Sequence, residues 1–304
     1  MKAGGGVRLL QRLDAYEKLM RLDKPIGILL LLWPTLWGVW FAAGGCPAWL
    51  VLFVFVLGTV LMRSAGCVIN DWADQQFDRY VTRTRARPLV LGTVSNTEAI
   101  VLFVLLVASA LTLLLLIATP LLLLLSSVAL LLAISYPFTK RCLALPQAYL
   151  GLAFGFGIPM AYAAQLGHVP ATAWWLLLAN LFWVVAYDTE YAMVDRQDDL
   201  KIGIRTSAIT FGAYDVLAVA ICYAGALAIL AWVGHGLAMG TFFYLGLLLA
   251  ALLASYHVYM IRQREPAACF KAFLHNNWLG AAIFAGIVCD FAQRFGTSCF
   301  LGYY

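Results

Sequence analysis

Nine stretches of the sequence are long and apolar enough to cross a lipid bilayer, and this constrains the fold more than any other feature. A transmembrane helix needs roughly 20 predominantly apolar residues. Only 12% of the 304 residues are charged, whereas a soluble domain carries about 25%. Backbone polar groups inside a bilayer must be satisfied within the spanning segment, so each span is predicted to be a helix. The predicted spans are residues 26–43, 48–68, 98–118, 120–137, 144–166, 172–192, 214–234, 237–261 and 277–293.

The predicted fold is therefore an all-α membrane protein with nine transmembrane helices in one bundle. Residues 1–25 are interpreted as a basic, amphipathic N-terminal segment on the cytoplasmic side, and residues 26–304 as the transmembrane domain. The four histidines are scattered along the sequence and indicate no pair of metal ligands.

Lysine and arginine are distributed unevenly between the two faces of the predicted bundle. Of the 20 basic residues, 19 fall before the first span or in the connections on that same side. Arg63 is assigned to one of these connections, between the second and third spans, and only Arg294 falls on the other face. The positive-inside rule then places the N-terminus in the cytoplasm and the C-terminus on the opposite side. The basic connections also suit an anionic substrate or anionic lipid headgroups.

Two short acidic clusters lie at the ends of the second and sixth spans, both on the predicted cytoplasmic side. They are Asn70–Asp78 and Asp195–Asp199. If the helices continue, Asp71, Asp74 and Asp78 share one face at i, i+3 and i+7. Asp195 and Asp199, at i and i+4, share another. Carboxylates this close repel one another unless a positive charge lies between them.

A divalent cation is the positive charge that this pattern favours. Mg²⁺ is usually held by one or two carboxylates, with waters and substrate phosphates completing its coordination. Solvated helix ends would explain a lone aspartate, but they explain two such clusters on one side less well. The predicted metal-binding and catalytic residues are the aspartates of the two clusters, with the Asn70 amide assisting: Asp71, Asp74, Asp78, Asp195 and Asp199.

Other polar residues near the clusters are candidates for substrate binding. Asp188 lies seven residues before Asp195, near the membrane boundary, where ionisable groups usually have a function. Glu190 also lies near the membrane boundary and is a weaker candidate. Asp198 points away from the face that Asp195 and Asp199 share, and it is expected to be solvated.

The segment Tyr136–Arg141 follows the fourth span on the same side as the carboxylates. Lys140 can act as a point charge on phosphate, and the fork of Arg141 can grip phosphate or carboxylate in two places. Further candidates are Arg63, Arg83, Arg85, Arg87 and Arg205. Membrane anchoring would explain any one of these cations, but it explains less well why they crowd behind the acidic clusters.

At these residues the chain resembles the UbiA-type membrane prenyltransferases. The similarity rests on NDxxDxxxD at Asn70–Asp78, DxxxD at Asp195–Asp199 and YPxxK at Tyr136–Lys140, and it extends over nearly the whole chain. Four further strings are similar to the branch of 4-hydroxybenzoate polyprenyltransferases: Arg21–Gly27, Gly66–Asp71, Tyr187–Asp195 and Phe273–Asn277.

The resemblance implies a reaction that suits these residues. Mg²⁺ on the five aspartates would bind the diphosphate of a polyprenyl donor, while Lys140 and an arginine would stabilise the leaving group. The ring of 4-hydroxybenzoate would then be prenylated at its 3-position, a step in ubiquinone biosynthesis. Arg63 or Arg141 would hold the acceptor carboxylate, and Asp188 or Asp195 would help to activate the phenol.

The remaining implied substrate-binding residues are Asn70, Tyr136 and Arg205. The expected location is a bacterial inner membrane, the expected partners are the two substrates and the lipid bilayer, and no nucleic acid is expected. Donor chain length and oligomeric state stay open.

Two alternatives differ from this prediction in substrate or in class. The same chemistry could prenylate another aromatic acceptor. A cation transporter with an acidic pathway would also need many spans, but its carboxylates should lie near the bilayer midplane, usually in broken helices. The clusters lie instead at the ends of the spans, which disfavours the transporter.

Overall fold

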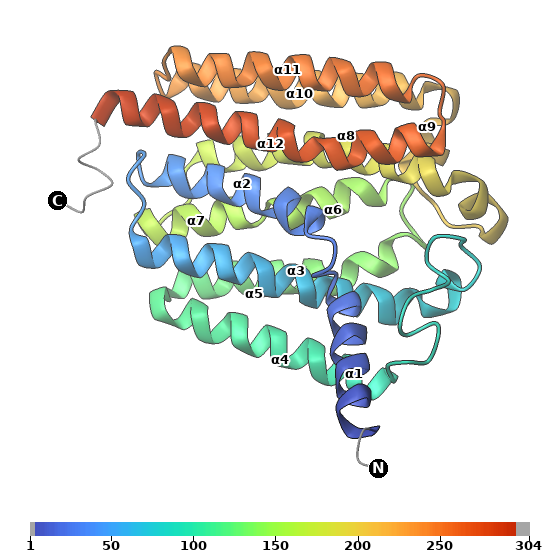
Figure 1. The fold of residues 1–304 in the computed structure, drawn as a ribbon. Coiled ribbons are helices and arrows are strands. Elements are labelled where there is room, and N and C mark those ends of the chain that lie inside the picture. Colours follow the sequence, from blue (N-terminus) through green and yellow to red (C-terminus); the bar gives the residue numbers. More distant parts are fainter. Residues whose placement is uncertain (1–3, 296–304) are drawn as a thin grey trace.

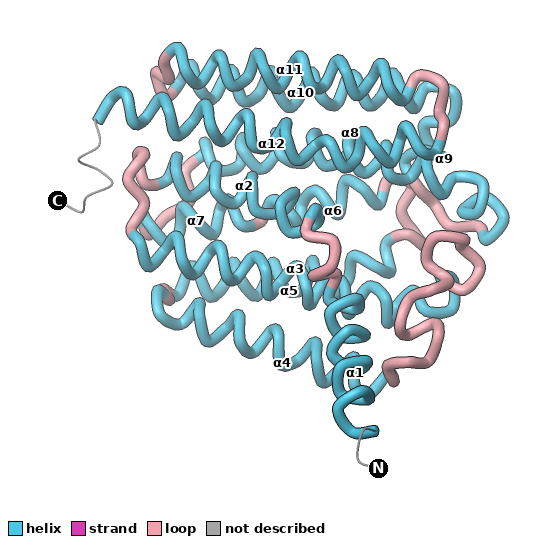
Figure 2. Tube along the Cα trace, viewed as in Figure 1, coloured by secondary structure: helices cyan, strands magenta, loops and turns pink. Residues whose placement is uncertain are grey.

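The computed structural model describes residues 4–295, and every regular element in that range is helical (Figures 1 and 2). Residues 1–3 of the predicted N-terminal segment, and residues 296–304 with the predicted external C-terminus, lie outside the described residues. The helices are α1 Gly4–Met20, α2 Ile26–Ala42, α3 Trp49–Asp78, α4 Asn96–Leu114, η1 Leu115–Ile117, α5 Pro120–Thr139, α6 Pro146–Gly155, α7 Gly157–Leu166, α8 Ala171–Ile202, α9 Ser207–Phe211, η2 Gly212–Tyr214, α10 Asp215–Gly236, α11 Thr241–Ile261 and α12 Pro266–Phe295.

The all-α membrane fold and its nine spans are confirmed within residues 4–295. Eight helical segments are long and apolar enough to cross a membrane, and the shorter apolar helix α2 supplies the ninth. The fifth span is divided into α6 and α7, which meet at Phe156. No acidic residue lies in this divided span, whereas a cation transporter would be expected to carry carboxylates in such a broken helix.

Three spans extend further than predicted. α3 continues to Asp78 and α8 to Ile202, while α12 already begins at Pro266. The helices thus continue past residues 68 and 192, where the predicted spans end, because a helix leaving the bilayer keeps its backbone hydrogen bonds when its side chains become polar. Both acidic clusters consequently lie on helices, and the helical spacing of their carboxylates is confirmed.

The spanning helices lie side by side, and α1 runs across them (Figure 1). α12 packs against α11, α8 and α2, whereas α4 lies at the edge against α3. α11 and α12 approach closely, since a Cβ on Gly246 would lie 2.8 Å from the carbonyl oxygen of Ala282. Small residues permit such close packing in membranes, where apolar side chains gain little by leaving lipid.

The N-terminal helix is fastened to the beginning of α4. Arg12 and Tyr16 both donate hydrogen bonds to Glu98, at 2.7 and 2.8 Å. Glu98 also completes a capping box with Ser95, which satisfies backbone groups at the start of α4. α1 ends at Met20, and the φ of 59° at the following Arg21 turns the chain into the connection to α2.

Candidate active site

A cavity of about 900 Å³ runs from the acidic helix ends into the bundle. Its apolar wall comes mainly from α2, α3, α4 and α5, with residues such as Val54, Leu111 and Leu130. Asp71 of α3 and Lys140, directly after α5, follow the apolar lining residues of these helices, so the wall is charged at the end where the clusters are. The polar lining residues include Arg21, Lys24, Arg63, Asn70, Asp71, Arg83, Arg87, Tyr136, Lys140, Tyr187, Asp188, Tyr191 and Asn277.

The first acidic cluster is buried, and each of its carboxylates is paired with a cation. Asp71, only 1% exposed, accepts from Arg21 at 3.0 Å through both oxygens and pairs with Arg87 at 2.9 Å. Arg87 also pairs with Asp78. Lys140 donates to Asp74 at 2.7 Å and to Asn70 at 3.4 Å. This pairing offsets the cost of burying charge.

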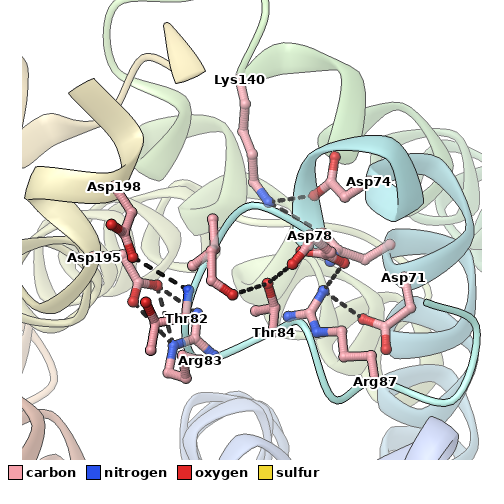
Figure 3. A network of polar contacts seen from close by, with 12 residues as sticks. Asp71, Asp74, Asp78, Thr82, Arg83, Thr84, Arg87, Lys140, Asp195 and Asp198 are labelled. Carbon is pink, nitrogen blue, oxygen red and sulfur yellow. Dashed lines mark hydrogen bonds and ion pairs between the residues drawn. The ribbon is translucent and has the colours of Figure 1, made fainter. Parts of the chain in front are cut away.

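The second cluster is joined to the first by the loop between α3 and α4. Arg83 donates to both oxygens of Asp195, and the backbone N–H of Thr82 donates to Asp198 at 3.2 Å. Figure 3 shows Arg83 and Arg87, from this one loop, pointing to opposite sides of the site. The two clusters therefore lie at the same end of the bundle. Asp198 anchors the loop, which corrects the prediction that it is simply solvated.

Two of the cations remain protonated in this environment. Burial lowers the pKa of Lys140, but the nearby Asp74 and Tyr136 outweigh burial, so its pKa lies above the ordinary value. For Arg83, burial likewise lowers the pKa, and Tyr191 and Asp195 raise it beyond the ordinary value. Positive charge therefore persists at the polar end of the cavity.

The structure divides the predicted substrate and metal residues into two groups. Arg63, Asn70, Asp71, Tyr136, Lys140 and Asp188 line the cavity. Those that do not line it are Asp74, Asp78, Asp195, Asp199, Arg141 and Arg205. Arg141 donates to the carbonyl of Ala73 at 2.9 Å, and Arg205 to that of Cys142 at 3.1 Å.

Arg63 was predicted to lie in a connection between spans, but it lies inside α3. The assignment to a connection was wrong, because residue 63 already falls within the predicted span of residues 48–68, which is helical from Trp49 onwards. The side chain faces the cavity from within the bundle.

Several buried donors at the cavity lack hydrogen-bond partners within residues 4–295. They are Nε of Arg21, Nε of Arg63, Nε of Arg87 and the hydroxyl of Tyr187. Buried polar groups are normally hydrogen-bonded, so a group of unpaired donors beside a cavity marks that part of its wall as a candidate binding site. Three guanidinium donors and one phenol favour an anionic ligand.

Five of these cavity residues received no role from the sequence: Arg21, Lys24, Tyr187, Tyr191 and Asn277. All five belong to strings that mark the branch, so those strings were the available signal. Arg87 was predicted only as one of several candidate cations, because nothing distinguished it from the other arginines of its loop. Glu190 is fully buried but bonds Tyr223 and Asn276, and it does not line the cavity.

The donor set of the site is suited to Mg²⁺. Within residues 4–295, no three His, Cys, Asp or Glu side chains form a ready-made metal cluster. Mg²⁺ does not require one, because one or two carboxylates suffice when phosphates and waters complete the coordination. Asp71 and the Asn70 amide line the cavity, so their oxygens can share a metal with a phosphorylated ligand there.

The fold and the site define a polytopic membrane protein with a cavity for an amphiphilic anion. A family model described as the UbiA prenyltransferase family matches residues 31–279. The chain belongs to the UbiA prenyltransferase family, and it is a prenyltransferase. The predicted resemblance is confirmed, and membership of this family excludes the alternative of a cation transporter.

Curated relatives are similar over nearly the full length. The chain is 62% identical to a 4-hydroxybenzoate octaprenyltransferase of Dechloromonas aromatica, over 93% of this chain and 96% of that protein. It is also 62% identical to the protein of the same name from Thiobacillus denitrificans, over 95% and 98%.

Solved structures share the fold. A UbiA homolog from Aeropyrum pernix K1 in its apo form superposes with a TM-score of 0.76 and 26% identity, covering 86% of this chain and 97% of that one. A UbiA homolog from Archaeoglobus fulgidus, bound to GPP and Mg²⁺, has a TM-score of 0.68 at 18% identity, covering 90% and 99%.

The loop between α3 and α4 should loosen when Arg87 is replaced. Arg87→Gln removes the ion pairs with Asp71 and Asp78, and losing charged hydrogen bonds to buried groups costs about 1–3 kcal/mol. Hydrogen–deuterium exchange should increase across residues 79–95. Arg85→Gln, an exposed arginine of the same loop, is the matched control. Equal exchange in the two variants would show that Arg87 does not hold the loop.

Proposed function

We propose that this chain transfers a polyprenyl group from polyprenyl diphosphate to the 3-position of 4-hydroxybenzoate, releasing diphosphate, in ubiquinone biosynthesis. The observation that carries the proposal is the cavity, whose cationic end and long apolar wall match a diphosphate attached to an isoprenoid chain. The names of relatives that are 62% identical support the acceptor and favour an octaprenyl donor.

The diphosphate binds at the polar end of the cavity. Lys140 and Arg87 line this end, and their positive charge balances the charge that develops on the leaving group. Asp71 and the Asn70 amide would hold Mg²⁺ at the cavity wall, and the other carboxylates of the two clusters, Asp74, Asp78, Asp195 and Asp199, would complete its site. When bound, Mg²⁺ neutralises diphosphate charge and makes it a better leaving group. The Archaeoglobus fulgidus homolog described with GPP and Mg²⁺ supports this cofactor.

The isoprenoid chain lies along the apolar wall. Residues of α3, α4 and α5 form that wall, so the chain extends away from the charged end into the bundle. Burial of each CH₂ contributes about 0.8 kcal/mol relative to water. The walls also exclude water from the allylic carbon while its C–O bond breaks.

The acceptor binds beside Arg63. Arg63 lines the cavity with an unpaired Nε, whereas Arg141 is bound to a backbone carbonyl outside it. Arg63 is therefore assigned to the acceptor carboxylate. Asp188 lines the same cavity, while Asp195 is bound to Arg83, so Asp188 is assigned as the group that activates the phenol.

The bonds and the proton of the reaction can be accounted for with the two substrates and the chain's own groups. The allylic C–O bond breaks, and its electron pair leaves with diphosphate. The ring carbon next to the hydroxyl forms the new C–C bond and afterwards loses its proton. Asp188 is the carboxylate at the cavity wall that accepts a proton during these steps.

The protein is an integral membrane protein. We propose that it lies in a bacterial inner membrane with the N-terminus and the active site facing the cytoplasm. The uneven distribution of basic residues supports this orientation.

Cysteine labelling in intact cells tests the orientation. A cysteine at position 168, in the exposed connection between α7 and α8, should react with a membrane-impermeant maleimide from outside. A cysteine at position 91, an exposed site in the loop between α3 and α4, should react only after permeabilisation. Labelling in excess of the unsubstituted protein is the readout, and the reverse pattern would overturn the orientation.

Turnover tests the reaction and its metal together. Membranes holding the protein should prenylate 4-hydroxybenzoate from a polyprenyl diphosphate in the presence of Mg²⁺, and EDTA should abolish product. Turnover should fall about 100-fold or more in Asp71→Asn and in Asp195→Asn. Changing a group that only supports a metal ligand already costs about 10- to 100-fold.

Asp14→Asn provides the matched control, because Asp14 is an exposed aspartate of α1 that pairs with Lys18. Its turnover should equal that of the unsubstituted enzyme. Undiminished turnover in Asp71→Asn, or in the presence of EDTA, would contradict diphosphate binding through a metal. If the enzyme prenylates a different phenol and not 4-hydroxybenzoate, that phenol is the acceptor.

Arg63 and Arg141 should differ in acceptor binding. Arg63→Ala should raise the KM for 4-hydroxybenzoate by roughly 30-fold or more, because losing one partner of a buried charge pair costs about 2–5 kcal/mol. Arg141→Ala should change this KM much less. Initial rates at varied acceptor concentration measure both, and a larger effect at Arg141 would reverse the assignment.

A further inference from the structure

Gly27 lies directly against the guanidinium of Arg63. A Cβ on Gly27 would lie 2.5 Å from Nη2 of Arg63, 2.7 Å from Nε and 2.9 Å from Cζ. Such distances are too short for non-bonded atoms, so any side chain at this position would displace the guanidinium. Both residues line the cavity.

The guanidinium is held on its other sides as well. Nη1 donates to Sγ of Cys67, one turn further along α3, at 2.8 Å. The guanidinium carbon lies 5.6 Å from the ring centroid of Phe154, within the range of a cation–π contact. Arg63 therefore occupies a slot between the backbone of α2, its own helix and α6.

Space, and not backbone freedom, is what Gly27 provides. Glycine inside a helix costs about 1 kcal/mol relative to alanine. Gly27 is absent from the residues with positive φ, so no left-handed conformation requires it. Gly27 also ends the string Arg21–Gly27, whose first residue binds Asp71. The missing Cβ leaves room for the guanidinium.

We propose that Gly27 is a positioning residue that sets acceptor specificity by fixing Arg63 at the cavity wall. The inference rests on the proposed function, in which Arg63 binds the carboxylate of the acceptor. α2 begins without a side-chain cap, so the positive end of its dipole adds to the field around that carboxylate. A methyl group at position 27 displaces the tip of a flexible side chain, so the fold is kept while acceptor binding is lost.

The chain offers matched controls for this substitution. Gly58 and Gly66 of α3 line the same cavity, and a Cβ on either would meet no atom within 4 Å. Gly58→Ala therefore adds the same methyl group to the same cavity without contacting Arg63.

Steady-state kinetics with two acceptors provide the test. Gly27→Ala should raise the KM for 4-hydroxybenzoate on the order of 10- to 100-fold, the range that a misplacement of about 1 Å can produce. The KM for the polyprenyl diphosphate should stay unchanged. With the neutral 4-hydroxybenzamide, Gly27→Ala should match the unsubstituted enzyme, so the preference for a carboxylate should collapse. Gly58→Ala should retain that preference.

A double-mutant cycle separates positioning from general damage. In an Arg63→Ala background, Gly27→Ala should have no further effect, because the displaced group is gone. An equal rise in KM in both backgrounds, or a Gly27→Ala enzyme that behaves like Gly58→Ala, would overturn this inference alone. If the unsubstituted enzyme does not prenylate 4-hydroxybenzoate at all, the proposed function fails and this inference fails with it.

Discussion

The pairing of Asp71 with two arginines is the interaction on which the rest of the site depends. Asp71 is almost completely buried at the end of α3, where an unpaired charge would cost several kcal/mol. Arg21 reaches it from the end of α1, and Arg87 from the loop that follows α3. One buried carboxylate thus fastens the N-terminal helix and the loop to the same helix end. Arg83 of the same loop donates to Asp195, so the second cluster is also held by an arginine–carboxylate pair.

The sequence predicts the spans well because bilayer thickness fixes their length and hydrophobicity. It also predicts that the two acidic clusters are helical and lie at one end of the bundle. It does not fix how far α3 and α8 continue beyond their spans, since hydropathy reports where the membrane ends and not where the helix ends. Arg63 shows the same difficulty: it is read as a residue of a connection, but it lies in α3 and faces the cavity.

The remaining contacts depend on tertiary structure that local pattern does not contain. Arg79, Arg83, Arg85 and Arg87 look alike in the sequence, and only the path of the loop decides which of them meets Asp71. The histidines are scattered along the sequence, yet His257 and His275 meet in the structure. Their ring nitrogens lie 2.9 Å apart, because α11 and α12 pack together along their length.

Arginine rather than lysine at the cavity explains how a stable structure can also bind an anion. A guanidinium has five N–H donors in a fixed fork, whereas an ammonium is a compact point charge. Arg21 and Arg87 use their terminal nitrogens on Asp71, and their buried Nε atoms remain unpaired. The nitrogens that bind Asp71 are thus different from the Nε atoms, which lack a partner beside the cavity. A lysine at either position would place its whole charge on the carboxylate and leave no fixed, buried donor at the cavity.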